Sequence, residues 1–181
     1  MKEINTFSLL TSMLEVTPKK GPRPQPHGVN FRRTRDDAVT VTATCGHALL
    51  EVRTTTSEID CPQDTDLTAC GDSLRRILKL FSYKKPPTVL VTSGGVYLDD
   101  YPIDLVDMKF PDTSRVINAR TDKTRSANAQ GVDLVLLASL AKSISRLVGF
   151  AEFTSHDFNG FMFVRTLGAH KVTVVLMPAR I

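Results

Sequence analysis

The sequence contains no apolar run near the roughly 18 residues that a membrane-spanning helix requires. Its first residues, MKEINTF, also lack the charged and then apolar pattern of a secretory signal peptide. We therefore expect no membrane partner and a cytoplasmic location. With 181 residues, 41% of them hydrophobic, the chain can bury a core and corresponds to one globular domain or to one and a half.

Cysteine is also scarce, and no C-x-x-C zinc or redox motif is present. The three cysteines, an odd number, are expected to be reduced. Cys45 and His47 lie two residues apart and are able to share one face of a strand, but two ligands do not make a metal site, and His27 is the only other candidate nearby in the sequence. A residue pair at a strand end is therefore favoured over a metal site.

A catalytic constellation is missing as well. Ser155, His156 and Asp157 spell out a catalytic triad, yet triad members converge from separate parts of a fold, so we predict a turn there. SGGV at 93–96 lacks the GK[ST] ending of a phosphate-binding loop. We expect no catalytic residue, no metal and no cofactor, and hence no enzyme. A small hydrolase or metalloprotein built on Cys45, His47 and His156 stays open as an alternative.

Apolar spacing predicts three helices. In DSLRRILKLF (72–81), Leu74, Ile77, Leu78 and Phe81 fall at i, i+3, i+4 and i+7, with Asp72 as the N-cap. FSLLTSMLEV (7–16) and DLVLLASLAKSISRLV (133–148) repeat the spacing.

Period-two strands follow each helix. They are expected near 29–31, 39–43 and 48–52, then near 89–91, 96–98 and 101–110, and finally near 150–153, 161–163 and 172–176. The pattern predicts an α+β protein of three helix-plus-antiparallel-strand units, with the helices on one face, because the connections look too short for parallel crossovers.

Two of the predicted helices carry basic residues off their apolar stripe. These are Arg75, Arg76 and Lys79 on the second helix and Lys142 and Arg146 on the third. If the helices lie side by side, the basic faces would merge into a track able to contact phosphates without reading bases. Ordinary solvated helix faces are an equally good explanation from these residues alone.

Four segments, in order, resemble the bacterial sliding clamp, the β subunit of the replicative DNA polymerase. ATCGHALLEVR (43–53) is similar to the clamp's ATDGHRLAxxR, and the preceding GVNFRRTRDDAVTVTA (28–43) resembles its GVLFE-to-TLVATD strands. KFPDTSRVI (109–117) resembles FPDYRRVIP, and VVLMPARI (174–181) resembles VVMPMRL. The resemblance implies the DNA clamp fold, shortened to about one and a half clamp domains. Residues 1–117 would be a complete domain with halves of about 1–62 and 63–117, residues 118–126 a linker, and 127–181 the second half of the third clamp domain.

In that family the motifs form a hydrophobic pocket for QLxLF-type peptides of polymerases and other partners. The resemblance assigns this pocket to Thr44, Gly46, His47, Ala48, Leu49, Pro111, Val116, Val175, Leu176, Met177, Pro178, Ala179 and Arg180. Four positions depart from the family pattern: Cys45 stands for Asp, Ala48 for Arg, Ala179 for Met, and Pro26 for Leu.

The resemblance also implies a ring around double-stranded DNA, with Arg75, Arg76, Lys79, Lys142 and Arg146 facing the duplex without sequence preference. A clamp ring has twelve halves, so three halves per chain favour a homotetramer. We expect a processivity factor associated with the nucleoid. The alternative is a clamp mimic or adaptor that binds clamp-interacting motifs without forming a ring.

Overall fold

The computed structural model describes residues 4–18, 28–33, 38–117, 134–148, 154–156, 160–167 and 170–176. Its helices are α1 (Thr6–Val16), α2 (Gly71–Leu78), the short α3 (Ser114–Ile117) and α4 (Leu134–Val148). All three helices expected from apolar spacing are therefore confirmed. The predicted linker 118–126 lies outside the described residues.

The ends of α2 differ from the prediction. Asp72 is not the N-cap, because the helix begins at Gly71 after Cys70, and no side chain caps it. Asp72 lies in the first turn instead, where its carboxylate pairs with Arg75 at 3.1 Å. At the other end, α2 stops at Leu78, so Phe81 lies beyond the helix and packs edge-on against Tyr101.

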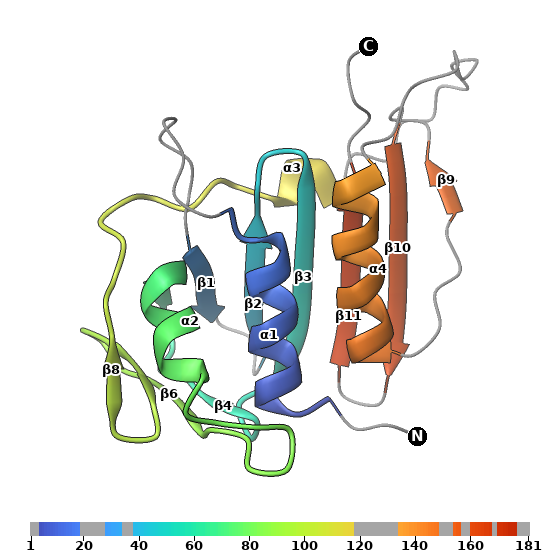
Figure 1. The fold of residues 1–181 in the computed structure, drawn as a ribbon. Helices are drawn as coiled ribbons and strands as arrows, with labels where there is room; N and C mark the ends of the chain where they lie inside the picture. The colour runs from blue at the N-terminus through green and yellow to red at the C-terminus, as the bar shows by residue number, and fades with distance from the viewer. Residues whose placement is uncertain are drawn as a thin grey trace.

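Seven strands form one sheet in the order β5-β1-β2-β3-β11-β10-β9, and every pairing in it is antiparallel. They are β1 (Gly28–Arg33), β2 (Ala38–Thr44), β3 (Ala48–Thr55), β5 (Thr65–Cys70), β9 (Thr154–His156), β10 (Gly160–Leu167) and β11 (His170–Leu176). The strands after α4 thus continue the sheet begun after α1, through the β3–β11 pairing (Figure 1). Ser155 and His156 belong to β9, so the turn predicted there is wrong, while Asp157 lies outside the described residues.

The second sheet has four short strands in the order β4-β6-β7-β8. They are β4 (Ile59–Asp60), β6 (Val89–Val91), β7 (Val96–Leu98) and β8 (Tyr101–Ile103). The pairing of β4 with β6 is parallel, which corrects the prediction of antiparallel pairs alone. The long connection between them, with β5 and α2, makes this crossover feasible. β8 ends at Ile103, well short of the strand predicted to reach residue 110.

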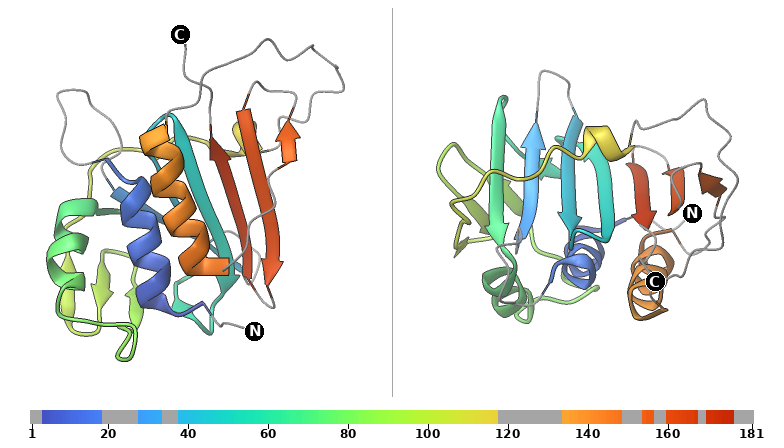
Figure 2. Two further views of the ribbon diagram at one scale, coloured as in Figure 1. Left: turned by 45° about the vertical axis from the view of Figure 1, so that its right-hand side comes forward. Right: turned by 90° about the horizontal axis from the view of Figure 1, so that it is seen from above.

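The helices cover one face of the seven-stranded sheet, and residues 104–117, here called the strap, cross its other face, the outer face (Figure 2). Alternation places fully buried residues of the three central strands beneath the helices. These are Val39, Val41 and Ala43 of β2, Ala48, Leu50 and Val52 of β3, and Val172, Val174 and Leu176 of β11.

Helix α1 lies between α2 and α4 and contacts both (Figure 1). Against α4, the Ser143 hydroxyl donates to the Ser12 carbonyl at 3.1 Å, and small side chains at this buried contact let the helices approach closely. Against α2, the Arg75 guanidinium donates to the carbonyls of Leu14 at 3.0 Å and Thr17 at 2.6 Å. The helix layer is thus held together by polar contacts as well as by the apolar core.

Candidate functional site

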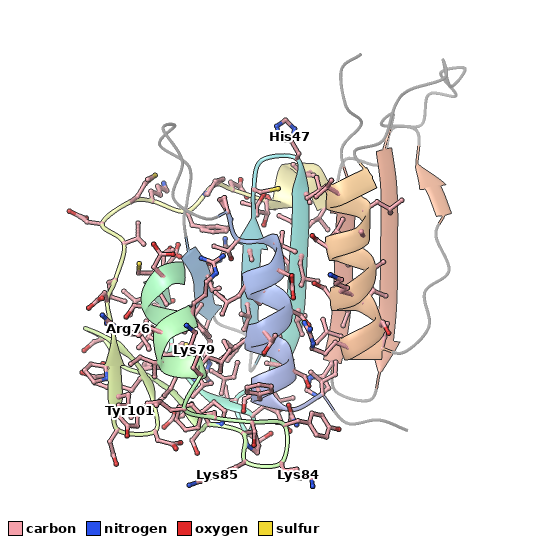
Figure 3. All side chains as sticks on the ribbon, in the orientation of Figure 1. His47, Arg76, Lys79, Lys84, Lys85 and Tyr101 are labelled. Atoms are coloured by element: carbon pink, nitrogen blue, oxygen red, sulfur yellow. The ribbon has the colours of Figure 1, made fainter. Side chains whose placement is uncertain are left out.

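The hairpin tip between β2 and β3 is a tight turn. The Thr44 hydroxyl donates to the Ala48 carbonyl at 2.8 Å and accepts the Gly46 N–H at 3.1 Å. Gly46 has a φ of +83°, a left-handed conformation that favours glycine. Cys45 and His47 therefore lie in a turn, with the His47 side chain projecting into solvent (Figure 3).

Among the described residues, no metal site is found near this turn. All three cysteines are free thiols. Within the described part of the chain, no three His, Cys, Asp or Glu side chains gather as metal ligands. His27, the third ligand considered from the sequence, lies outside that part.

Below the turn, three residues of the predicted peptide pocket form one row on the outer face. Leu49 of β3 pairs with Thr44 of β2 on one side and with Val175 of β11 on the other. We call these three residues the outer row. Ala48 and Leu176 pair with each other one position along, so their side chains face the helices and belong to the core. The structure thus brings the first and last motifs into adjacent strands.

The middle motif reaches the same side of the sheet through the strap. Helix α3 contacts β11, and the Thr113 hydroxyl lies 3.5 Å from the Glu51 carboxylate of β3. Pro111 is exposed and Val116 is half-buried. The remaining predicted pocket residues, Met177, Pro178, Ala179 and Arg180, lie outside the described residues.

A polar pocket of about 270 Å³ adjoins the outer row and was not predicted. Strands β1, β2, β3, β5 and β11 form one side of it, and the strap forms the other. Glu51 is half-buried there, and this burial raises the pKa of its carboxyl above the usual 4.5. The Thr113 hydroxyl and the positive charges of Lys171, Arg32 and Arg53 lower that pKa, but not enough to cancel the effect of burial.

Glu51→Gln is expected to raise the melting temperature by a few degrees at neutral pH and to change it little below about pH 4. The raised pKa means that the folded state holds the proton more tightly, so stability falls as pH rises through the window above 4.5. The neutral amide of Gln removes the free-energy cost of burying a charged carboxylate. Thermal unfolding at both pH values measures it, with the exposed Glu58→Gln as control. A lower melting temperature at neutral pH would mean that the neighbouring cations outweigh the burial.

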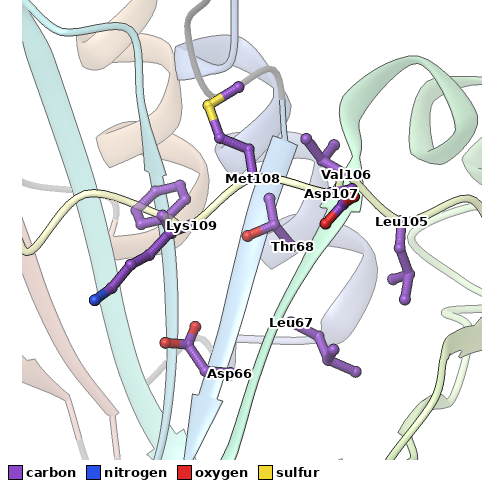
Figure 4. A pocket seen from close by; sticks show the side chains of 9 residues that line it. Asp66, Leu67, Thr68, Leu105, Val106, Asp107, Met108 and Lys109 are labelled. Carbon is purple, nitrogen blue, oxygen red and sulfur yellow. The ribbon is translucent and has the colours of Figure 1, made fainter.

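A second pocket, of about 410 Å³, lies between β5 and the strap. Figure 4 shows Asp66, Leu67 and Thr68 on one side and Leu105 to Lys109 on the other. The strap pairs with β5 only at Ala69 and Leu105 and then diverges, which opens this pocket at the edge of the sheet.

The predicted DNA-facing residues fall into two groups. The Arg75 guanidinium donates hydrogen bonds to carbonyls at the end of α1 and to the Asp72 carboxylate. Arg146 forms an ion pair with Glu15 of α1 at 3.7 Å. In contrast, Lys79 and Lys142 are exposed, and the exposed Arg76 donates to the Ser73 hydroxyl at 3.4 Å and pairs with Asp104 at 3.6 Å. The first pair of side chains therefore ties the helices together, while the second group faces solvent.

Helix α1 separates the basic side chains of α2 from those of α4. Its sequence, TFSLLTSMLEV, has no Lys or Arg, and its exposed charge is Glu15. The basic faces therefore do not merge into the continuous track that side-by-side helices were expected to give.

Sequence reasoning missed a basic loop directly after α2, residues 79–86. Lys84 and Lys85 are exposed at the tip of this loop, below Lys79 and Arg76 in Figure 3. Paired hydrogen bonds between Ser82 and Lys85 close the loop, and the Asn5 amide donates to the Tyr83 carbonyl at 3.2 Å. The run YKKPP was a usable signal, but it lies outside the helical periodicity.

No protein-family model matches the chain, and no curated protein matches it in sequence. Solved structures of bacterial sliding clamps do match. The beta clamp of Helicobacter pylori bound to 3,4-difluorobenzamide superposes with a TM-score of 0.64 at 13% identity, over 99% of this chain and 65% of that chain. The beta chain of DNA polymerase III from Streptococcus pneumoniae superposes with a TM-score of 0.62 at 15% identity, over 100% of this chain and 67% of that chain. The sliding clamp of Pseudomonas aeruginosa superposes with a TM-score of 0.65 at 13% identity, over 97% of this chain and 66% of that chain.

The matches confirm the clamp fold that the four sequence segments implied. The chain spans about 65% of the length of the H. pylori clamp. At these identities the likeness concerns the fold alone. None of the described helices is both long and apolar enough to cross a membrane.

Proposed function

We propose that this protein is a shortened sliding clamp that holds a partner protein at double-stranded DNA. The observation that carries the proposal is the outer row, in which Thr44 and Leu49 of the ATCGHAL segment and Val175 of β11 lie in adjacent strands beside the strap. Three segments far apart in the sequence thereby supply one surface. The proposed activity is tethering, which raises the partner's effective concentration at DNA and needs no catalysis by the tether.

The proposed peptide site has Leu49 and Val175 as its apolar floor, with Pro111 and Val116 of the strap beside it. Met177 to Arg180, which follow β11, would complete the wall. Such a surface suits an extended QLxLF peptide, whose leucine and phenylalanine anchors bury apolar area while the rim stays polar.

The proposed DNA-binding surface is centred on α2 and the basic loop. Arg76, Lys79, Lys84 and Lys85 are all exposed, and Lys142 adds a cation on α4. Lysine and arginine contacts to phosphates release counterions and give affinity without sequence preference. Such a surface would keep the protein at the nucleoid.

The number of chains in solution tests the ring. Twelve clamp halves at three per chain require four chains of 20.0 kDa, so we expect a closed tetramer of about 80 kDa. Light scattering after size exclusion measures the mass, and dilution through the micromolar range shows whether the assembly persists. A stable 20.0 kDa monomer at every concentration would exclude the ring.

The monomer result would favour the second candidate, a clamp mimic that binds clamp-interacting motifs without encircling DNA. The α1 face between α2 and α4, which has no Lys or Arg and carries Glu15, supports this alternative, because it interrupts the basic surface that a DNA-lined ring would present. Peptide binding without DNA binding would be its signature.

A further inference from the structure

The polar pocket next to the outer row has a charge pattern that the clamp motifs do not explain. Three cations line it, Arg32 of β1, Arg53 of β3 and Lys171 of β11, together with two acids, Glu51 and Asp66. The pocket therefore carries one net positive charge, three cations against two carboxylates.

Both acids already have hydrogen-bond partners inside the protein. The Asp66 carboxylate accepts from the Asn30 amide at 2.7 Å, and the Glu51 carboxylate accepts from the Thr113 hydroxyl at 3.5 Å. The residues Arg32, Arg53 and Lys171 are exposed to solvent, and all three lie near enough to Glu51 to lower the pKa of its carboxyl. An incoming carboxylate would meet donors at this pocket, and charge-assisted hydrogen bonds to such donors are about twice as strong as neutral ones.

The pocket shares one lining residue with the proposed peptide site. Pro111 belongs to the proposed wall of that site and also lines the pocket. Along β3, Leu49 of the outer row is followed on the same face by Glu51 and then by Arg53. Alternate residues of a strand lie about 7 Å apart, so Arg53 is about 13 Å from the row, a distance that about four residues of extended peptide span.

We propose that this pocket binds an acidic side chain that flanks the apolar anchors of the partner peptide. The apolar row would fix where the peptide sits, and Arg32, Arg53 and Lys171 would select for Asp or Glu within about four residues of the anchors. The inference rests on the proposed function, since it concerns the same peptide, and it adds a determinant of which partners bind.

Fluorescence anisotropy with three labelled peptides tests it. All share the core QLSLF, with serines on both flanks in the first peptide, glutamates on the N-terminal flank in the second and glutamates on the C-terminal flank in the third. One acidic peptide is expected to bind about tenfold more tightly than the serine peptide. This advantage should vanish in Arg32→Gln with Lys171→Gln. It should persist in the matched control, Lys84→Gln with Lys85→Gln, which removes the same charge from the basic loop.

The outcomes separate the two proposals. Equal affinity of all three peptides for the unmodified protein would overturn the acidic site while leaving peptide binding intact. Equal loss of the acidic advantage in both double variants would also overturn it, because net charge alone would then be the cause. Failure of every peptide to bind would overturn the peptide site and the acidic pocket together.

Discussion

A variant with Arg76→Glu, Lys79→Glu and Lys84→Glu is expected to bind a short DNA duplex at least about a hundredfold more weakly at low salt than the unmodified protein. The three positions are exposed and lie on α2 and the adjoining basic loop. Each substitution replaces a cation that releases a counterion on binding by an anion that repels the phosphates. The slope of log affinity against log salt should therefore become shallower as well.

The matched control reverses the same number of charges elsewhere. Arg32→Glu, Lys109→Glu and Lys171→Glu change exposed residues of β1, the strap and β11. This control should keep most of the DNA affinity if the helix side carries the contact. Equal losses in the two triple variants would instead indicate that net charge, rather than a defined surface, governs binding. Circular dichroism of both variants checks that the fold persists.

The second large effect is expected from deletion of Met177 to Ile181, which should abolish detectable binding of a QLxLF peptide. Strand β11 ends at Leu176, paired with Ala48 beside the hairpin tip, so the deletion leaves every described strand pairing in place. It removes MPARI, the segment assigned to the opposite wall of the site. Loss of a central anchor-binding wall commonly costs more than about 2 kcal/mol.

Anisotropy titration of the truncated and full-length proteins measures the loss, with a scrambled peptide as the control for non-specific binding. Thermal unfolding should give nearly the same melting temperature for both proteins, since the deleted residues follow the last strand. Unchanged peptide affinity in the truncated protein would contradict the carry-over of this motif.

The sequence predicted those parts of the fold that local periodicity determines. The apolar stripes of α1 and α4 located both helices, and period two located β1, β2, β3 and β11. The cap of α2 was wrong because Asp72 followed by an apolar stripe is equally compatible with a cap and with a first-turn residue that pairs with Arg75. The parallel pairing of Ile59 with Val89 depends on a crossover, which no local pattern encodes.

For the candidate site, too, the sequence predicted what local spacing determines and missed what depends on contacts between elements. Helical spacing showed that Arg75 and Arg146 lie off the apolar stripes, but not that they bond to α1, because such partners come from another element. Lys84 and Lys85 were missed since they lie between periodic segments. The clamp resemblance named Leu49 and Val175, and the strand register was needed to show that they are neighbours.

The join between β3 and β11 gives the proposed peptide a second role. A peptide lying over Leu49 and Val175 would contact both β3 and β11, which are paired by hydrogen bonds. The proposed peptide therefore binds only while β11, in the third predicted unit, is paired with β3, in the first. Two coupled equilibria follow: docking prepares the site, and an occupied site opposes undocking by RT ln(1 + [L]/Kd). The bound partner would then stabilise the β3–β11 pairing of the protein that binds it.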